Sequence, residues 1–290
     1  MERAVLIGVD SRDGELRAWA FDADGTVISH ATAPFAPAPD SDSATALVTT
    51  FLRNNLPGAD RIPVVACGNL DTGPGQGTGH FVQVPMLLND LCEYLDLRDG
   101  IHVVPGLKRL SPPDILNGEE TQLFGLGDLS GDVCIPGMHT RHISLEQGRV
   151  LDFSSEMTGE IHKLLLGTGA LALRPGIEQK FDMAIFRDWV ERSLDTDDAA
   201  SPFAVRAARL IGTLRPEHQS AALSGLLIGA CVAAHYDPGD DVLLVADGHR
   251  FETYGMALDT LGASVEEYSA IETLQDGLFE IADESGLLDT

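Results

Sequence analysis

The chain has 290 residues, of which 44% are hydrophobic and 22% are charged, a composition typical of a folded globular protein rather than a disordered tail. Its 45 acidic residues against 19 basic ones give a formal net charge of −26, which disfavours nucleic acid and anionic membranes as partners, because both require a basic face. Four cysteines stand far apart without a C-x-x-C pair, so reduced, buried thiols are expected rather than a zinc knuckle or a disulfide framework.

Three short strands are expected at the start of the chain. Apolar or alternating residues predict strands at 5–9, 16–21 and 27–30. The dipeptides Asp13-Gly14 and Asp24-Gly25 lie between them and are typical of tight turns, since both residue types tolerate positive φ. The chain therefore opens as a three-stranded meander.

A helix at 44–56 and a buried strand at 62–66 follow the meander. The stretch 68–79 is too rich in glycine for regular structure and is long enough to be a functional loop, but it lacks the Gly-Lys-Ser/Thr of a Walker loop. Further strands are predicted at 81–84 and 101–104. We expect Pro112-Pro113 to end regular structure before a helix at 117–126.

The opening pattern then returns, with strands predicted at 132–135, 142–145 and 150–153. Two halves that each begin with three strands and then turn helical indicate a duplicated α/β fold, with two lobes and a cleft between them. We place the lobes at residues 1–128 and 129–290.

The second half is predicted to be mainly helical. Helices are expected at 159–166, 182–194, 203–214 and 221–235, the last apolar almost all round and therefore interior. The apolar run 242–246 is typical of a parallel strand, and Asp247 and Gly248 directly after it occupy the position where open α/β sheets bind ligands. Because neither a signal peptide nor a stretch of roughly 18 apolar residues is found, we expect a soluble cytoplasmic protein.

Five motifs, taken together and in order, resemble the 2-dehydro-3-deoxygalactonokinase family. These bacterial sugar-acid kinases belong to the superfamily of actin, hexokinase and Hsp70, and the similarity runs from about Val5 to about Gly262. The resemblance implies an actin-like ATPase (ribonuclease H-like) fold, ATP with Mg²⁺ in the interlobe cleft, and phosphorylation of a 2-keto-3-deoxy sugar acid on its terminal hydroxyl. The motifs are 118–122 (GEETQ), 136–140 (PGMHT), 157–160 (MTGE), 205–207 (VRA) and 223–230 (LSGLLIGA).

The resemblance also implies roles for individual residues. Glu119 matches the catalytic glutamate of the related exopolyphosphatases and is the expected proton acceptor, and Asp10 is expected to hold Mg²⁺ through water. Gly137, His139 and Thr140 would form a phosphate turn, and Asp247 and Gly248 would lie beside adenosine. Candidates for contact with the acidic sugar are Arg17, Glu120 and Thr158.

Structural alternatives to these roles stay open. Asn117 and Glu120 together form a capping box, and Thr158 reads most simply as a helix N-cap. An aspartate at a strand end, such as Asp10, can cap a turn, and residues 137–140 suit an ordinary hairpin equally well. Arg17 can pair with a neighbouring acid.

Three ligand loops depart from the pattern of the family. Where its members have glycine and hydroxyl residues after the first strand, this chain has Arg12, Asp13 and Gly14. The loop at 71–77 lacks the arginine that can reach the substrate carboxylate, and the adenosine glycines read 246–248 (ADG). These departures support a second hypothesis, a catalytically impaired relative that binds a ligand or regulates; phosphohydrolysis is a third. The expected partner is a small sugar acid, and a homodimer is left open.

Overall fold

The structure, a computed structural model, describes residues 4–12, 14–35, 44–56, 58–70, 80–173, 175–195 and 201–289. The chain divides into two compact units. Unit 1 consists of Met1–Ser130, Ile143–Phe153 and Ala270–Thr290, and unit 2 of Gly131–His142 and Ser154–Ser269. The boundary predicted between residues 128 and 129 lies beside the first change of unit, but two later segments return to unit 1.

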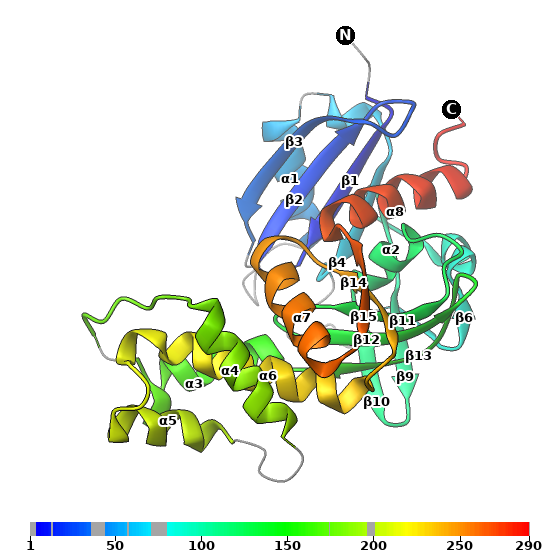
Figure 1. Ribbon diagram of the computed structural model, residues 1–290. Coiled ribbons are helices and arrows are strands. Elements are labelled where there is room, and N and C mark those ends of the chain that lie inside the picture. The colour runs from blue at the N-terminus through cyan, green and yellow to red at the C-terminus, as the bar shows by residue number, and fades with distance from the viewer. Residues whose placement is uncertain are drawn as a thin grey trace. The chain divides into compact units, whose positions relative to one another are not determined.

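The predicted opening meander is present in unit 1 (Figure 1). Strands β1 (Leu6–Ser11), β2 (Glu15–Phe21) and β3 (Val27–Pro34) pair antiparallel in that order. The second turn is held by the Asp22 carboxylate, which accepts hydrogen bonds from the N–H groups of Asp24 and Thr26 at 3.1 and 2.9 Å, while Gly25 supplies a φ of 77°. Asp13 of the first predicted turn lies outside the described residues.

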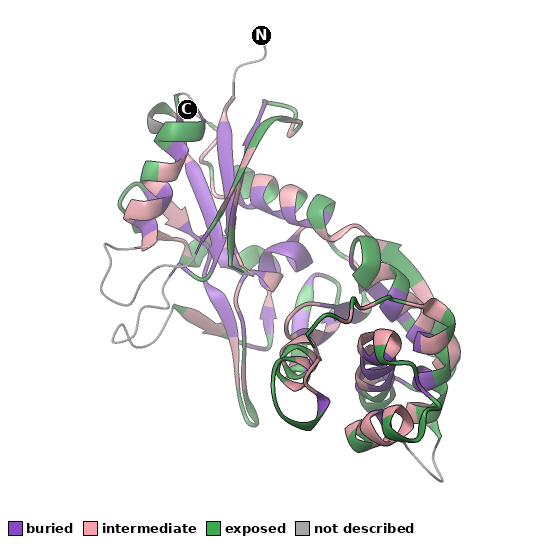
Figure 2. Ribbon diagram, turned by 90° about the vertical axis from the view of Figure 1, so that its left-hand side faces the viewer, coloured by how far each residue is buried: buried purple, intermediate pink, exposed green. Residues whose placement is uncertain are grey.

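Strand β1 lies in the middle of a six-stranded sheet of order β3-β2-β1-β4-β8-β7. It pairs parallel with β4 (Val64–Gly68), which pairs parallel with β8 (Ile101–Val103), and β7 (Asp96–Arg98) forms the edge. Every residue of β1 is buried, and Figure 2 shows the buried class running along the central strands. Side chains alternate between the two faces of a strand, so Ile7 and Val9 face one side and Gly8 and Asp10 the other.

Helices cover both faces of this sheet. Ile7 and Val9 pack in one core with Val48 and Leu52 of α1 (Ala44–Asn55). On the opposite face, a Cβ atom at Gly8 would lie 2.9 Å from the Leu278 side chain of α8 (Ala270–Glu284), so glycine there lets the last helix approach β1 closely. Neither α8 nor the strand β15 (Ser264–Tyr268) before it is predicted from the sequence.

A short sheet of order β10-β9-β5 also belongs to unit 1. Its strands are β5 (Phe81–Gln83), β9 (Gly106–Leu110) and β10 (Pro113–Leu116). The expectation that Pro112-Pro113 ends regular structure is wrong, because Ser111 and Pro112 form the turn of the β9–β10 hairpin and Pro113 begins its second strand. Pro113 is the first residue of an edge strand, where a missing N–H is tolerated.

Helix α2 (Glu119–Phe124) is shorter than the predicted 117–126. It is preceded by Gly118, whose φ of 109° is not helical, and followed by Gly125. A Cβ atom at Gly125 would overlap the Thr273 carbonyl of α8, so the two helices are in backbone contact at this point. The position of α2 is therefore set by α8.

The predicted duplication is confirmed by the strand order of the third sheet, β15-β14-β11-β12-β13-β6. Read outward from each meander, β3-β2-β1-β4-β8 corresponds to β13-β12-β11-β14-β15, and in both series the last three strands are parallel. The remaining strands of this sheet are β6 (Met86–Leu87), β11 (Gly131–Ile135), β12 (Thr140–Glu146), β13 (Arg149–Glu156) and β14 (Asp241–Val245).

Helices α3 (Thr158–Gly167), α4 (Met183–Leu194), α5 (Pro202–Ile211), α6 (Gln219–His235) and α7 (Gly248–Leu261) complete unit 2. Helix α6 is largely buried, as predicted, and a Cβ atom at Gly225 would overlap the Phe186 carbonyl of α4. Within the ranges that the structure describes, none of the helices is both long and apolar enough to span a membrane.

Candidate functional site

Asp10 is the penultimate residue of strand β1 and lies on the face that α8 covers. Its side chain is fully buried, and in the β1–β2 register it lies directly opposite Arg17. The Arg17 guanidinium donates a hydrogen bond to Asp10 Oδ2, so this cross-strand pair is ionic. Arg17 Nε is buried and finds no partner within the described part of the chain.

Arg12 binds the other oxygen of the same carboxylate. Its Nε donates to Asp10 Oδ1 at 2.8 Å, and its NH1 donates to Gln122 Oε1 on α2 at 2.8 Å. The same NH1 lies 3.9 Å from Glu119 Oε1. Arg12 thus joins the end of β1 to the start of α2.

The two arginines fix the charge state of this cluster. Burial alone would raise the pKa of Asp10, but the guanidinium groups of Arg12 and Arg17 outweigh it and lower the pKa. The Cys67 thiol, 3.9 Å from Asp10 Oδ1, is buried beside this negative charge, and both effects hold its pKa well above the usual range. Asp10 is therefore a carboxylate and Cys67 a neutral thiol.

The two adjacent glutamates of α2 have different environments. Glu119 is partly accessible, with 13% of its side chain exposed, and accepts a hydrogen bond from the Asn117 N–H at 2.9 Å. Glu120 is fully buried, and both its carboxylate oxygens accept the Gly118 N–H, at 2.7 and 2.8 Å. Burial, with the charge of Glu119 second, raises the pKa of Glu120 to about 8.

Glu120 does accept a backbone N–H at the start of the helix, as the capping interpretation predicts, but the N-cap residue is Gly118 and not Asn117. Helix α2 begins after Gly118, so the glutamate reaches back to the glycine N–H, and the Asn117 amide donates to Asn69 Oδ1 at 3.0 Å instead. This position leaves Glu120 no accessible surface for a substrate.

The surroundings of Asp10 do not fit the magnesium site that the sequence predicts there, because two arginine side chains bind its carboxylate. A water bound to Mg²⁺ would need to reach an oxygen of Asp10, whereas this side chain is fully buried and each of its oxygens already accepts a hydrogen bond from an arginine. In the described part of the chain, no three His, Cys, Asp or Glu side chains are grouped to hold a metal ion.

In unit 2, the predicted phosphate turn connects β11 to β12 and rests on the first residues of α3. The N–H of Glu160 donates to the Met138 carbonyl at 3.0 Å, and the Glu160 carboxylate lies 2.8 Å from His139 Nε2. A Cβ atom at Gly159 would lie 2.8 Å from the Gly137 carbonyl oxygen, so glycine at 159 permits this close approach. The turn is therefore held by α3.

Thr140, at the end of this turn, and Thr158, at the start of α3, have almost no solvent-accessible surface. Both are buried, and the Thr140 hydroxyl hydrogen-bonds to the Tyr254 hydroxyl. The expectation that Thr158 is an N-cap is wrong: α3 begins at Thr158 itself, with Met157 in the cap position. Its side chain contacts Tyr254 and Cys231, so it packs inside the unit.

Asp247 and Gly248 follow β14, as predicted: Asp247 is the N-cap residue of α7 and Gly248 is the first residue of that helix. Because β11 and β14 run parallel with Cys134 opposite Leu244, both strands end at the same edge of the sheet as the 136–139 turn. The Asp247 carboxylate accepts the Ser269 hydroxyl at 2.8 Å. Gly248 has a φ of 54°, and a Cβ atom there would meet no atom within 4 Å, so the backbone at this helix start lies open.

The structure thus gathers the predicted residues into one cluster per unit. Unit 1 brings together Asp10, Arg17, Glu119 and Glu120, and unit 2 brings together Gly137, His139, Thr140 and Thr158, with Asp247 and Gly248 at the same sheet edge. Sequence reasoning missed Gln122 and Arg12 as members of the first cluster. Gln122 stands three residues after Glu119, a spacing that places both on one helix face.

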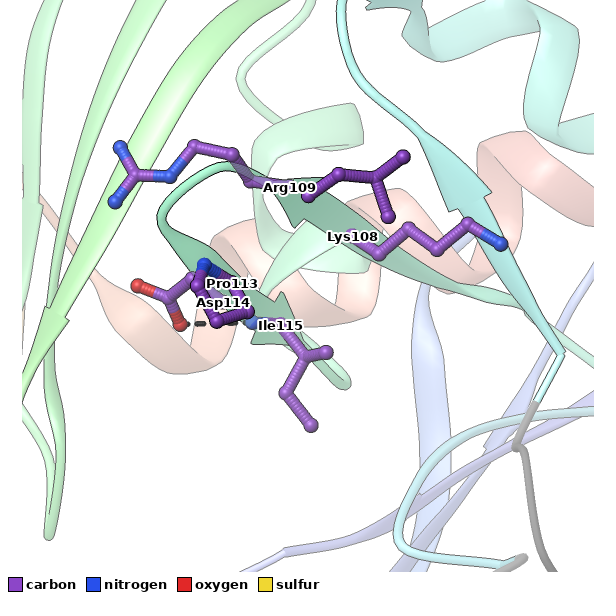
Figure 3. Close-up of a pocket in the computed structure, with 6 residues that line it drawn as sticks. Lys108, Arg109, Pro113, Asp114 and Ile115 are labelled. Atoms are coloured by element: carbon purple, nitrogen blue, oxygen red, sulfur yellow. Dashed lines mark hydrogen bonds between the residues drawn. The ribbon is translucent and has the colours of Figure 1, made fainter.

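A separate surface hollow lies on the β9–β10 hairpin (Figure 3). None of the predicted site residues lines it, and the side chains of Lys108 and Arg109 point to opposite sides of β9. Arg109 is bound by Asp152 at 3.1 and 3.2 Å, so its charge is already paired. The lining residues are Lys108, Arg109, Leu110, Pro113, Asp114 and Ile115.

The duplicated sheets and their strand-end clusters define the class of protein, an actin-like ATPase and sugar-kinase fold. Over 96% of this chain and 95% of the other, the structure is similar to the activator of the 2-hydroxyisocaproyl-CoA dehydratase from Clostridium difficile, solved with bound ADPNP, with a TM-score of 0.52 and 9% identity. That likeness concerns the fold alone.

Closer relatives show the family. The sequence is 32% identical to the 2-dehydro-3-deoxygalactonokinase of Escherichia coli K12 over 96% of this chain and 98% of that one. A crystal structure from Sinorhizobium meliloti, whose description also names a 2-dehydro-3-deoxygalactonokinase, has a TM-score of 0.83 and 27% identity over 96% and 98% of the two chains. Residues 10–281 match the family described as 2-keto-3-deoxy-galactonokinase, and the chain belongs to that family.

Proposed function

We propose that this protein transfers the γ-phosphoryl group of ATP to the terminal hydroxyl of 2-dehydro-3-deoxy-D-galactonate or a closely related 2-keto-3-deoxy acid. The family match over residues 10–281 supports the reaction class. The observation that carries the assignment of the base is the contrast between two adjacent glutamates. Glu119 is partly accessible, and Glu120 is fully buried on the Gly118 N–H.

Glu119 is the proposed proton acceptor. As the hydroxyl oxygen of the sugar acid attacks the γ-phosphorus, its proton passes to the Glu119 carboxylate and the bond between the γ-phosphorus and the β–γ bridging oxygen breaks, releasing ADP. The hydrogen bond from the Asn117 N–H and the nearby Arg12 guanidinium hold this carboxylate in place. A positioned base of this kind contributes roughly 10²- to 10⁴-fold to the rate.

The remaining residues are assigned by unit. In unit 2, Gly137 and His139 of the β11–β12 turn are proposed to meet the phosphates of ATP, and Asp247 and Gly248 the adenosine. In unit 1, Arg17 is the proposed cation for the acidic substrate. Magnesium is proposed to accompany the triphosphate, because Asp10 does not fit as its ligand.

The test is ADP formation by the purified protein with ATP, Mg²⁺ and 2-dehydro-3-deoxy-D-galactonate. Wild type and Glu146→Gln, which changes an exposed glutamate at the end of β12, are expected to release ADP only when the sugar acid is present. Glu119→Gln is expected to be at least about 100-fold slower. Equal rates for Glu119→Gln and wild type would contradict the assignment of the base.

The second candidate is a family member with impaired catalysis that binds a ligand or regulates. The observation in its favour is Arg12, which stands where family members have a glycine and is bound by Asp10 and Gln122. This candidate predicts no ADP release with the sugar acid. ATP binding without turnover would support it over the kinase.

A further inference from the structure

The Arg12 side chain lies in a slot that two glycines leave open. A Cβ atom at Gly68, at the end of β4, would lie 2.9 Å from Arg12 Cγ, and one at Gly118, before α2, would lie 2.5 Å from Arg12 Cδ. Both glycines also have positive φ values, 92° and 109°. Any larger residue at either position would displace the arginine, so the surrounding backbone accommodates this side chain closely.

The guanidinium is surrounded by oxygen atoms from two elements. Asp10 on β1 supplies Oδ1 at 2.8 Å, and Gln122 on α2 supplies Oε1 at 2.8 Å, with Glu119 Oε1 at 3.9 Å. Two carboxylates and an amide carbonyl form the kind of hard oxygen set that also attracts a divalent metal ion. Here a side chain of the protein already occupies the centre of that set.

The charge at this centre is permanent. Although burial lowers the pKa of Arg12, the charges of Asp10 and Glu119 outweigh it and raise the pKa above its usual value. Arg17 brings a second guanidinium to the remaining oxygen of Asp10. A divalent ion at Asp10 would therefore be placed against two positive charges and would have to displace a hydrogen bond on either oxygen.

We propose that the Arg12 guanidinium is a built-in cation that takes the place of a divalent metal ion among Asp10, Glu119 and Gln122. The protein then holds no divalent ion at Asp10, and the arginine performs the ion's structural task of keeping the Asp10 and Glu119 carboxylates close together. This inference concerns the cation site itself and does not rest on the proposed kinase activity.

The test measures Mn²⁺ binding to the nucleotide-free protein by the electron paramagnetic resonance signal of free Mn²⁺. It uses moderate salt, so that weak sites on the acidic surface are screened. Asp10→Asn is expected to leave Mn²⁺ binding by the otherwise wild-type protein unchanged. Arg12→Gly is expected to bind one additional Mn²⁺, tighter by about tenfold than the background sites, because a unit charge is removed from beside the carboxylates. That additional site is expected to vanish in the double variant Arg12→Gly/Asp10→Asn.

Two further variants separate this effect from a change in folding or net charge. Arg12→Lys keeps a cation in the slot and is expected to gain no site, whereas Arg12→Gln fills the slot without charge and is expected to gain one. Arg192→Gln removes a surface arginine that pairs with Asp188 at 2.9 Å and is expected to gain none. Circular dichroism confirms that each variant is folded.

Two results would overturn the proposal. One is a Mn²⁺ site in the wild-type protein that Asp10→Asn removes. The other is a failure of both folded variants, Arg12→Gly and Arg12→Gln, to gain a site that depends on Asp10. Because no ADP is measured, a failure here is distinguishable from a failure of the proposed kinase activity.

Discussion

Gly125, directly after α2, and Gly277, within α8, face each other where the two helices cross. A Cβ atom at Gly125 would lie 2.8 Å from the Gly277 amide nitrogen, and one at Gly277 would lie 3.1 Å from the Gly125 nitrogen and overlap the Thr121 carbonyl. The backbones are therefore in contact without an intervening side chain. Helix α2 carries Glu119 and Gln122, so this contact fixes the helix that supplies the proposed base.

Replacing Gly277 with alanine is expected to destabilise the protein. Alanine favours an open helix by about 1 kcal/mol over glycine, but the overlap with α2 outweighs this gain, and we expect a net loss of about 2 kcal/mol in the free energy of unfolding. The control is Gly255→Ala in α7, where the nearest atom to the new Cβ is Leu244 Cδ2 at 3.8 Å, and a small gain in stability is expected. Urea unfolding measures both, and equal stabilities for Gly277→Ala and wild type would contradict the close packing.

Glu120 makes the protein less stable at alkaline pH. Its pKa rises from 4.5 in the unfolded chain to about 8 in the folded one, so the unfolded state loses its proton first. The stabilisation is complete below about pH 4.5 and is lost as the pH rises through 8. Relative to Glu120→Gln, wild type is expected to lose about 3 kcal/mol of unfolding free energy between pH 5 and 8.5. Parallel pH profiles for the two proteins would show that Glu120 titrates normally.

His142, in unit 2, makes the protein less stable at acidic pH. Burial first, and the neighbouring His235 second, lower its pKa from 6.5 to about 3, so the unfolded chain binds a proton that the folded one does not. Stability is complete above about pH 6.5 and falls as the pH drops toward 3. Relative to His142→Gln, wild type is expected to lose about 2 kcal/mol between pH 7.5 and 5. Urea unfolding at the two pH values measures the difference, and an unchanged difference would contradict a buried neutral imidazole.

Replacing Gly159 with alanine tests whether the β11–β12 turn binds the phosphates of ATP. Alanine at 159 would place its Cβ 2.8 Å from the Gly137 carbonyl oxygen and 3.0 Å from Met138 Cα, so the turn must move away from α3. We expect the KM for ATP to rise by about tenfold, a loss of about 1.4 kcal/mol, while the KM for the sugar acid changes little. Gly167→Ala, at the other end of α3, is the matched control, since nothing lies within 4 Å of its Cβ position. A common rise in both KM values would indicate general damage instead.

The sequence predicts much of the fold because most strands and helices are specified by patterns of neighbouring residues. Apolar runs predict the two meanders, with Asp-Gly turns as a further signal in the first, and the uniformly apolar segment 221–235 predicts the buried helix α6. The β9–β10 hairpin is not predicted, because Pro112-Pro113 indicates the end of regular structure rather than a turn between two strands. Helix α8 was not predicted, although its apolar side chains pack on β1 and its Gly277 permits the contact with α2.

The site was predictable as a set of residues but not as a set of contacts. Asp10 and Glu119 were identified from their motifs, yet Arg12 joins them only because the fold brings α2 beside the end of β1. Its hydrogen bond to Gln122 spans 110 positions in the sequence. Likewise, Thr140 and Tyr254 meet across 114 positions, so no local pattern places that hydroxyl inside unit 2.

The return of α8 to unit 1 also determines when the site can form during synthesis. All residues of the Asp10 cluster have been made by position 122, but the helix that fixes α2 begins only at Ala270. A nascent chain that has just completed unit 2 therefore carries every residue of the Asp10 cluster while α2 still lacks its support. The Asp10 cluster is therefore completed only after α8 has been synthesised, and unit 1 cannot mature independently of the segment that follows unit 2.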